Sequence, residues 1–443
     1  MSDTFKKKVG FISLGCDKNR VDLEKVISRL STYSCFEFVS NKEDAEIIII
    51  NTCAFLLDAR NESFSLIKEM SYLKEMRLEK LIVMGCLPML EKDKTAQDYP
   101  LIDALIVPSE YDKIDEIIFK LYKAQKPSSN DSPHRMLTTP LHYAYLKIAD
   151  GCNNRCAFCK IPFIRGSYKS EDMSALLKEA QALANSGVKE IILVAQDITK
   201  YGCDNNYKEN LVTLLKNLSK IKKLSWIRLL YCYPDMVTDE LIEEIKTNPK
   251  VLHYLDIPLQ HISNSVLQNM HRISRKEDII SLISKLRTEI PDIVIRSTFM
   301  VGFPGETKHD FNELLSFLNE YQLDNVGFFK YSREEGTASY DMPNQVTEKE
   351  KDKRLKKVQQ LQEKISNAKN TSMFGKTFKV IVDSFDSQHK FYVGRTYGMA
   401  PDVDFEVLFS CPYNIKLGAF VDVDILDYDK GYFIGQVDRR TTY

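Results

Sequence analysis

The sequence predicts an α/β protein with an N-terminal doubly wound parallel sheet, a central partial (β/α) barrel and a small antiparallel β-barrel at the C-terminus. Two observations predict this architecture. From the N-terminus to about residue 345, short apolar runs alternate with polar, helix-permissive stretches, as in parallel sheets covered by helices. After residue 374, short strand patterns separated by turns replace this alternation, which is typical of a small barrel of OB-like size.

The first predicted domain covers residues 1–125. Its apolar runs have the length of buried strands and lie at residues 9–14, 45–50, 80–85 and 104–107. Helix-permissive stretches separate them at residues 20–30, 58–70 and 111–123. Residues 126–140 are polar and contain proline, which is typical of a linker.

The second predicted domain covers residues 141–345 and repeats the alternation. Its six strand patterns lie at residues 143–148, 190–195, 226–231, 254–258, 294–301 and 325–331. Parallel strands with intervening helices form a barrel or a partial barrel, and in such folds the functional residues lie at the C-terminal ends of the strands.

A helix is predicted to connect this domain to the last one, over residues 346–373. Leu355, Val358, Leu361 and Ile365 form an apolar stripe there in an otherwise charged stretch. The stripe favours a helix packed on the barrel, and a coiled-coil or nucleic-acid-binding arm is the alternative. The last domain, residues 374–443, has strand patterns at residues 377–383, 392–397, 405–409, 419–426 and 432–437.

The charge of the 443-residue chain excludes a broad basic field of the kind that draws nucleic acid, because the formal net charge is −1. A local basic patch remains compatible with this balance. No apolar run approaches the roughly 20 residues that span a bilayer. Residues 9–14 follow three lysines, but they are shorter than the ~7–15 residues of a signal-peptide core. We therefore expect the protein in the cytoplasm.

Three of the ten cysteines, Cys152, Cys156 and Cys159, lie close together in the run GCNNRCAFC. Three thiolates at this spacing hold three irons of a 4Fe–4S cluster and leave the fourth iron open. A zinc site is the alternative, but zinc usually recruits a fourth Cys or His, and none follows closely. The run also comes just after the first strand of the predicted barrel, where such folds place their chemistry.

A second trio, Cys16, Cys53 and Cys86, is spread over the first domain, and each member follows a predicted strand. A parallel sheet brings such positions to one edge, so the trio predicts a second cluster. Simple burial is the alternative, since cysteine is among the most buried residue types. The other four cysteines lack such spacing and are interpreted as structural: Cys35, Cys203, Cys232 and Cys411.

The run GCNNRCAFC, including Phe158 before its third cysteine, resembles the radical S-adenosylmethionine (SAM) superfamily. The resemblance implies that SAM binds the open iron through its methionyl amine and carboxylate. It also implies that an electron from the cluster breaks a carbon–sulfur bond of SAM and produces a 5′-deoxyadenosyl radical. The implied cofactors are two 4Fe–4S clusters and S-adenosyl-L-methionine.

The two trios together resemble the methylthiotransferase family along essentially the whole chain, and within it the RimO branch. The stretches that carry this resemblance are SLGCDKN (13–19), NTC (51–53), VAQD (194–197), DIPLQH (256–261) and YSREEG (331–336). Asp17 departs from the pattern, because the family usually has proline there. The resemblance implies an N-terminal cluster domain, a radical SAM barrel and a C-terminal TRAM barrel.

The same resemblance implies a reaction. One SAM supplies a methyl group, another is the radical source, and a methylthio group is added to the β-carbon of an aspartate in ribosomal protein S-twelve. The alternative within the family is a tRNA adenosine beside the anticodon. A cluster-bearing assembly factor without turnover is the alternative from another class. An electron donor such as flavodoxin or ferredoxin would be a further partner.

Four residues are expected to contact SAM because they match family positions at strand ends: Gln196, Asp197, Arg296 and Gly302. His261 is either a site residue or a core histidine. Asn19 and Asn51 are expected either to donate hydrogen bonds to cluster sulfurs or to cap turns.

The charge of the last domain bears on the substrate. Residues 374–443 contain eight Lys or Arg and ten Asp or Glu, a net charge of −2. A barrel that grips RNA should be basic, because phosphate contacts dominate affinity. An acidic barrel favours a basic protein partner such as a ribosomal protein, unless a small basic face is hidden in the net charge.

Overall fold

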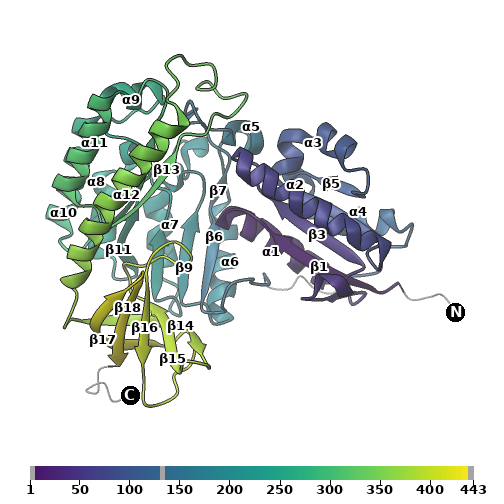
Figure 1. The fold of residues 1–443 in the computed structure, drawn as a ribbon. Coiled ribbons are helices and arrows are strands. Elements are labelled where there is room, and N and C mark those ends of the chain that lie inside the picture. Colours follow the sequence, from purple (N-terminus) through teal and green to yellow (C-terminus); the bar gives the residue numbers. More distant parts are fainter. Residues whose placement is uncertain (1–4, 130–134, 438–443) are drawn as a thin grey trace.

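A computed structural model describes residues 5–129 and 135–437 of the chain. It contains two parallel sheets and a closed barrel, which follow one another along the chain (Figure 1). Residues 130–134 of the predicted linker and residues 438–443 of the predicted last domain lie outside the described part. No helix among the described residues is both long and apolar enough to cross a membrane.

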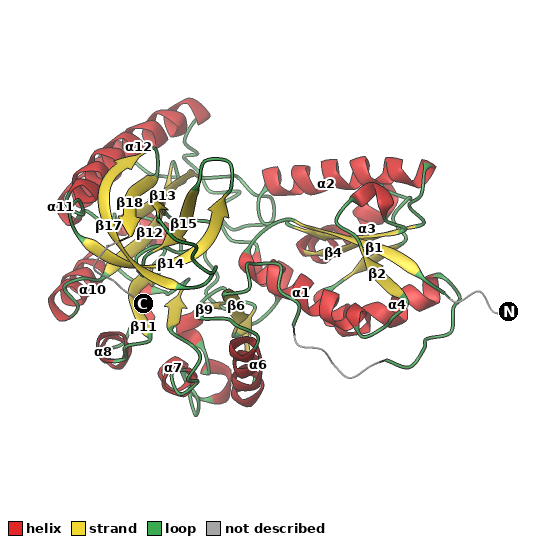
Figure 2. Ribbon diagram, turned by 90° about the horizontal axis from the view of Figure 1, so that it is seen from below, coloured by secondary structure: helices red, strands yellow, loops and turns green. Residues whose placement is uncertain are grey.

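The first sheet has five parallel strands in the order β2-β1-β3-β4-β5. Its strands are β1 Lys7–Ser13, β2 Phe36–Phe38, β3 Ile47–Thr52, β4 Lys80–Gly85 and β5 Ala104–Ile106. Its helices are α1 Asp17–Ser31, α2 Leu57–Tyr72, α3 Cys86–Asp98 and α4 Ile114–Leu121. Helices cover both faces (Figure 2), so the predicted doubly wound sheet is confirmed.

The side chains of β3 point alternately to the two faces of the sheet, which explains why helices cover both faces. Ile47 and Ile49 belong to the core under α1 and α4, whereas Ile48 and Ile50 belong to the core under α2 and α3. All four side chains are fully buried. Successive side chains of a strand point to opposite faces, so an unbroken apolar run requires helices on both sides.

The second sheet has six parallel strands in chain order, with β6 and β13 at its two edges. It is therefore an open, partial barrel. Its strands are β6 Tyr143–Lys147, β9 Glu190–Val194, β10 Trp226–Leu229, β11 Val251–Asp256, β12 Val294–Val301 and β13 Asn325–Lys330, with the short pair β7 Ala149–Asp150 and β8 Lys169–Ser170 beside them. Its helices are α5 Ile161–Arg165, α6 Met173–Asn185, α7 Leu211–Leu218, α8 Asp239–Thr247, α9 Asn264–Asn269, α10 Lys276–Glu289 and α11 Lys308–Tyr321.

The C-terminal barrel closes in the order β14-β15-β16-β18-β17. Its strands are β14 Thr377–Asp386, β15 Phe391–Arg395, β16 Glu406–Ser410, β17 Phe420–Asp429 and β18 Tyr432–Val437. The barrel is confirmed, but one of its five pairings is parallel, that of β16 with β18. Two reversals of the chain, through β17, return β18 to the direction of β16. The predicted connecting helix is α12, Glu348–Thr371, and it contacts β13 and α11.

In the first domain two elements are missing from the expected pattern, β2 and α3, and in the second the short pair β7 and β8 is missing. β2 has only three residues, too few for a period-2 pattern. α3 contains Pro88 and a non-helical residue, Glu91, with φ −139°, so its apolar periodicity is broken. Residues 251–253 also belong to β11, although the pattern places that strand's start at residue 254.

The barrel packs on the second sheet where the strands begin. Glu190 and Arg228, near the starts of β9 and β10, are fully buried, and the Glu190 carboxylate accepts from Arg228 Nε at 2.7 Å. Arg395 of β15 donates to the same carboxylate at 2.8 Å. Burial alone would raise the pKa of Glu190, but the two guanidinium groups outweigh it and lower that pKa. This seat leaves the C-terminal ends of the strands uncovered by the barrel.

We expect Glu190→Gln to destabilise the protein by about 3–5 kcal/mol, because it leaves two buried guanidinium groups without their shared carboxylate. Urea-induced unfolding measures this loss. The control is Glu240→Gln, which removes an exposed ion pair with Lys216 and should change stability by no more than about 0.5 kcal/mol. Equal losses in the two variants would contradict a special role of the buried triad.

Candidate functional site

The loop that carries Cys152, Cys156 and Cys159 begins directly after β7, beside the C-terminal end of β6. Its first residue must be glycine. Gly151 has φ +77°, and a Cβ there would lie 2.2 Å from the Ser167 carbonyl oxygen. The three cysteines line a cavity of about 540 Å³. The structure thus brings the predicted trio together around one space.

Hydrogen-bond donors surround the sulfurs of this trio. The Asn154 N–H donates to Cys152 Sγ at 3.5 Å, and the Ile161 N–H donates to Cys159 Sγ at 3.4 Å. Cys156 Sγ lies 3.1 Å from the Tyr233 hydroxyl and 3.8 Å from Arg272 Nη1. Such donors stabilise thiolates and tune the potential of an iron–sulfur cluster.

The chemistry of the donor set fits a cationic metal group. Burial raises the pKa of the Cys159 thiol to about 12 and also raises the pKa of Cys152. A thiolate at these positions therefore needs a nearby positive charge, which ligated iron supplies. In the described part of the chain, no three cysteine sulfurs lie within 4.8 Å of one another. Sulfurs around a single zinc ion are about 3.8 Å apart, so this spacing suits a larger group.

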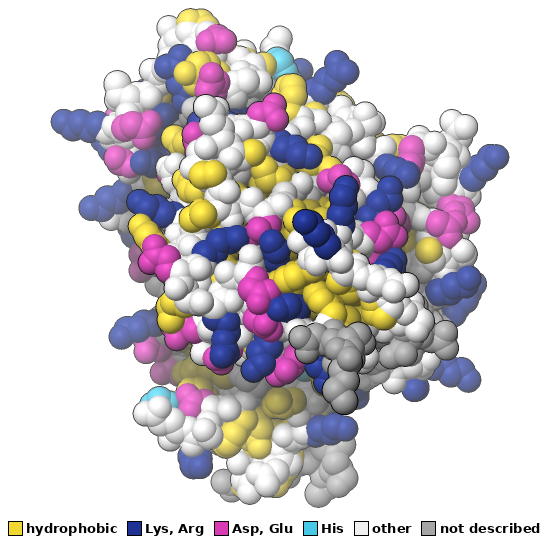
Figure 3. Space-filling view, turned by 90° about the vertical axis from the view of Figure 1, so that its right-hand side faces the viewer, with side chains coloured by type: hydrophobic (Ala, Val, Ile, Leu, Met, Phe, Trp, Pro, Cys, Tyr) yellow, Lys and Arg dark blue, Asp and Glu magenta, His cyan; other side chains and the backbone are white. Residues whose placement is uncertain are grey.

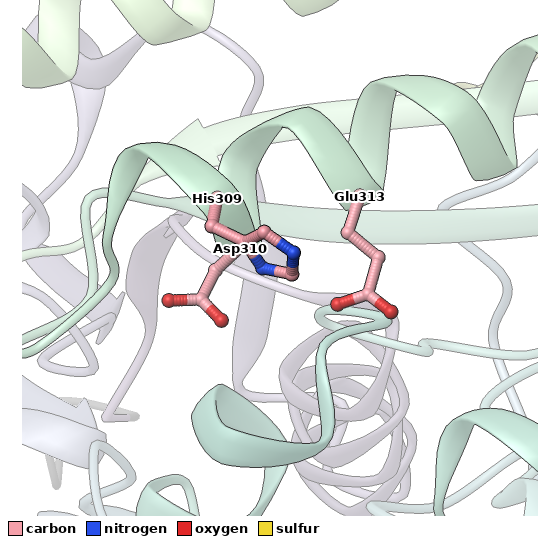
Figure 4. Close-up of side chains that lie close together, drawn as sticks. All are labelled: His309, Asp310 and Glu313. Carbon is pink, nitrogen blue, oxygen red and sulfur yellow. The ribbon is translucent and has the colours of Figure 1, made fainter.

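A different cluster of potential ligands lies at the start of α11, where His309, Asp310 and Glu313 have ligand atoms within 4.8 Å of one another (Figure 4). Asp310 already accepts hydrogen bonds from the N–H and hydroxyl of Thr307 at the helix N-terminus, and from the Ser263 hydroxyl. Glu313 is paired with a lysine. The cluster caps a helix and is not interpreted as a metal site.

The second trio meets at the C-terminal edge of the first sheet. Asn19 Oδ1 lies 4.0 Å from Cys16 Sγ and 3.7 Å from Cys86 Sγ. A Cβ added to Gly15, the residue before Cys16, would lie 3.4 Å from Cys53 Sγ. Burial raises the pKa of both Cys53 and Cys86. The sheet therefore gathers three cysteines that are 37 and 33 residues apart in the sequence.

Asp17, where the family usually has proline, does not disturb this edge of the sheet. Asp17 is the first residue of α1, after Cys16 at the N-cap. Both proline and aspartate suit the first turn of a helix, proline through its fixed φ and aspartate through the helix dipole. The substitution therefore preserves the turn that presents Cys16.

Arg165 links the segments that carry the two trios. It follows Cys159 by six residues, at the end of α5, and its Nη2 lies 3.6 Å from Cys86 Sγ. Its Nη1 donates to Asp22 at 2.8 Å and to Asp150 at 3.2 Å. Lys147 is paired with the same two carboxylates. This buried network joins α1 of the first sheet to the cysteine loop of the second.

Among the residues expected to contact SAM, Gln196 lies beside the first trio. Its Nε2 donates to Asp150 Oδ1 at 2.9 Å, while its Oε1 is buried without a hydrogen-bond partner among the described residues. Gln260, four residues after β11 and bridged to Phe299 of β12, also has a buried Oε1 without a partner among the described residues. Such orphaned acceptors are rare in folded proteins, and they fit the amine and hydroxyl donors of a ligand.

Asp197 holds the loop of the first cysteine trio in place through hydrogen bonds. It accepts from Asn154 Nδ2 at 3.0 Å and from the Thr199 N–H at 3.1 Å. Burial raises the pKa of Asp197. The residue thus orients the loop between Cys152 and Cys156, and its contact with SAM stays a prediction.

Arg296 and Gly302 have partners within the chain. Arg296 donates to Asp256 at 3.0 Å and to Asp404 at 3.3 Å, so its guanidinium joins the sheet to the C-terminal barrel. A Cβ at Gly302 would lie 2.3 Å from Lys351 Cγ of α12. Close helix packing explains this glycine. Both contacts with SAM stay predictions, and the structure offers a structural role for each residue.

His261 is fully buried, and its Nδ1 accepts from the Ser263 N–H at 3.0 Å, while its Nε2 has no hydrogen-bond partner among the described residues. Both interpretations of His261, site residue and core histidine, therefore stay open. Burial lowers the pKa of His261 to about 4, so the ring is neutral at pH 7. The Asn19 and Asn51 side-chain amides donate to backbone carbonyls, those of Thr52 and Asn19 respectively. These bonds favour the turn-capping interpretation.

Three residues of the site lie outside the sequence patterns: Arg165, Tyr233 and Arg272. Arg272 stacks on the Tyr233 ring at 4.0 Å, and both reach Cys156 from outside its loop. The position of Arg165 shortly after Cys159 is the one signal available, and spacing alone does not separate it from other arginines.

Three family models match the chain. The model described as "Radical SAM superfamily" matches residues 146–318, "Uncharacterized protein family UPF0004" matches residues 8–107, and "TRAM domain" matches residues 374–437. These matches agree with the two sheets and the barrel.

Solved structures share the fold at low sequence identity. The radical SAM methyltransferase TsrM from Kitasatospora setae, solved with cobalamin and a [4Fe-4S] cluster, has a TM-score of 0.55 at 12% identity, covering 76% of this chain and 77% of that one. The cobalamin-dependent radical enzyme OxsB has a TM-score of 0.53 at 16% identity, covering 81% and 56%.

Curated relatives match over nearly their full length. The ribosomal protein uS12 methylthiotransferase RimO of Clostridium botulinum (strain Eklund 17B) is 46% identical, covering 98% of this chain and 99% of the relative. RimO of Acetivibrio thermocellus is 44% identical, covering 99% and 100%. This identity over nearly the whole length of both relatives confirms the resemblance noted from the cysteine motifs, and the chain belongs to the RimO family of radical SAM methylthiotransferases.

Proposed function

We propose that this protein adds a methylthio group to the β-carbon of an aspartate in ribosomal protein uS12, with one SAM as methyl donor and another as radical source. The relatives named above supply the substrate. The observation that carries the proposal is the meeting of two cysteine trios, each at the C-terminal edge of a parallel sheet, with Arg165 linking the segments that carry them. Such a site suits a reaction that needs a radical source and a sulfur source side by side.

Cys152, Cys156 and Cys159 would hold the 4Fe–4S cluster that supplies the electron for SAM cleavage, and Cys16, Cys53 and Cys86 would hold the second cluster, at which sulfur is methylated. The chain's own residues then orient the groups. Asp197 holds Asn154 and with it the loop of the first trio. The free Oε1 atoms of Gln196 and Gln260 would accept from SAM donors.

Charge favours a protein substrate over tRNA. The last domain has a net charge of −2, whereas RNA binding requires a basic surface. On the face of the molecule shown in Figure 3, Lys and Arg side chains alternate with Asp and Glu and do not form a separate basic field. The positively charged ribosomal protein is the better complement to such a surface.

The proposal also implies where the protein acts and with which partners. It would act in the cytoplasm, on uS12 in or near the small ribosomal subunit, with a flavodoxin or ferredoxin as electron donor. The three domains would be residues 1–125, 141–345 and 374–443, joined by the linker 126–140 and the helix region 346–373.

Iron content tests the six ligands. Reconstituted wild-type protein should hold about eight irons, the sum of two 4Fe–4S clusters. Replacing Cys16, Cys53 and Cys86 together by alanine should leave about four, and so should replacing the other trio. The matched control replaces Cys35 and Cys411, and it should keep wild-type iron. A first-sheet triple variant with undiminished iron would refute the second cluster.

Mass spectrometry of uS12 tests the substrate. In cells that contain the gene, one aspartate of uS12 should gain about 46 Da, the replacement of H by SCH3. Cells without the gene should lack this gain, and a plasmid copy should restore it. If uS12 is unmodified in both and a gene-dependent methylthio-adenosine occurs in tRNA, the tRNA alternative is correct.

A further inference from the structure

Lys18 is a buried cation without an ion pair among the described residues. It lies in the first turn of α1, two residues after Cys16, and only 7% of its surface is exposed. No carboxylate oxygen comes within 4.0 Å of its ammonium group. Its Nζ lies 3.3 Å from the centroid of the Tyr231 ring and is hydrogen-bonded to that side chain, while Asp17 and Cys16 act on it only at longer range. Lysine is almost never buried unless it is paired, because removing an ammonium from water is costly.

The nearby carboxylates are engaged elsewhere. Asp17 accepts a hydrogen bond from the Tyr231 hydroxyl at 3.3 Å. Asp256 accepts from the Tyr231 N–H at 3.0 Å and is paired with Arg296. The ammonium group of Lys18 thus contacts the Tyr231 side chain and has no carboxylate within ion-pair distance among the described residues.

Lys18 lies close to segments of both cysteine trios. On the side of the first trio, it is two residues after Cys16 along the chain. Its ring partner Tyr231 follows β10, and two residues later Tyr233 places its hydroxyl 3.1 Å from Cys156 Sγ. The short segment after β10, with Tyr231 and Tyr233, therefore contacts both the Lys18 side chain and the cysteine trio of the second sheet.

We propose that Lys18 binds the side-chain carboxylate of the substrate aspartate. The inference rests on the proposed function and adds the residue that selects the substrate. The β-carbon of aspartate is bonded directly to the carboxylate carbon, so a cation that holds the carboxylate also positions the β-carbon between the two trios. An adenine base has no carboxylate that such a cation could hold.

The test compares three variants of the reconstituted holoenzyme. Lys18→Met keeps the length of the side chain and removes the charge, while Lys18→Arg keeps the charge. Lys25→Met is the matched control, because Lys25 is an exposed lysine of the same helix. The substrates are unmodified uS12 from cells without the gene, and uS12 in which the aspartate that the wild-type enzyme modifies is replaced by asparagine.

We expect Lys18→Met to keep wild-type iron content, cluster spectra and SAM cleavage in the absence of uS12. Its dissociation constant and KM for uS12 should rise at least about tenfold, as for the loss of one charge-assisted pair, with a smaller change in kcat. Lys18→Arg should recover part of the affinity, and Lys25→Met should behave as wild type. The asparagine substrate should weaken binding to wild type but not to Lys18→Met.

Two results would overturn the inference. Loss of iron or altered cluster spectra in Lys18→Met would show that Lys18 serves the neighbouring cysteine trio instead. Unchanged affinity for uS12, or the same preference for aspartate over asparagine as in wild type, would show that Lys18 does not bind the carboxylate. A wild-type enzyme that leaves uS12 unmodified would refute the proposed function itself, so the two failures are separable.

Discussion

Four buried charges hold the two sheets together and so decide how the cysteine trios face each other. Asp22 of α1 lies between Lys147 and Arg165 of the second sheet, and both cations also reach Asp150. Burial would raise the pKa of Asp150, but Lys147 and Arg165 outweigh it and lower that pKa to about 2. Buried charges are tolerable when they are paired, and here the pairing is possible only in one relative placement of the sheets.

The C-terminal barrel uses the opposite end of the second sheet. Two sets of ion pairs hold it there: one joins Glu190 to Arg228 and Arg395, and the other joins Arg296 to Asp404. Both sets lie near the starts of strands, so the barrel is anchored without covering the strand ends that carry the cysteines. Arg296 thus takes part in the anchor, and its contact with SAM stays a prediction.

The anchoring residues and the candidate site can be compared by whether their buried polar groups have hydrogen-bond or ionic partners. Each anchoring ion has an ionic partner, although Arg228 Nη2 has no hydrogen-bond partner of its own among the described residues. Gln196 Oε1 and Gln260 Oε1 also lack a hydrogen-bond partner among the described residues, and the Lys18 ammonium lacks an ion pair there. Buried polar groups in native proteins are nearly always paired. These three groups are therefore candidates for contacts with ligands that carry donors and a carboxylate.

The sequence by itself determined the parallel sheets, the closed barrel and the two cysteine trios, because strand periodicity and strand-end positions are local properties of the chain. It also predicted β12 at residues 294–301 as found. Only the tertiary structure decided the roles of Arg165, Lys18 and Arg296. A charged side chain gives the same pattern in the sequence whether it is solvated, paired or buried without a partner. Some of its neighbours also come from segments more than 100 residues away, as for Arg165 with Asp22 and Arg296 with Asp404. The folding of those segments against one another decides which of these states holds.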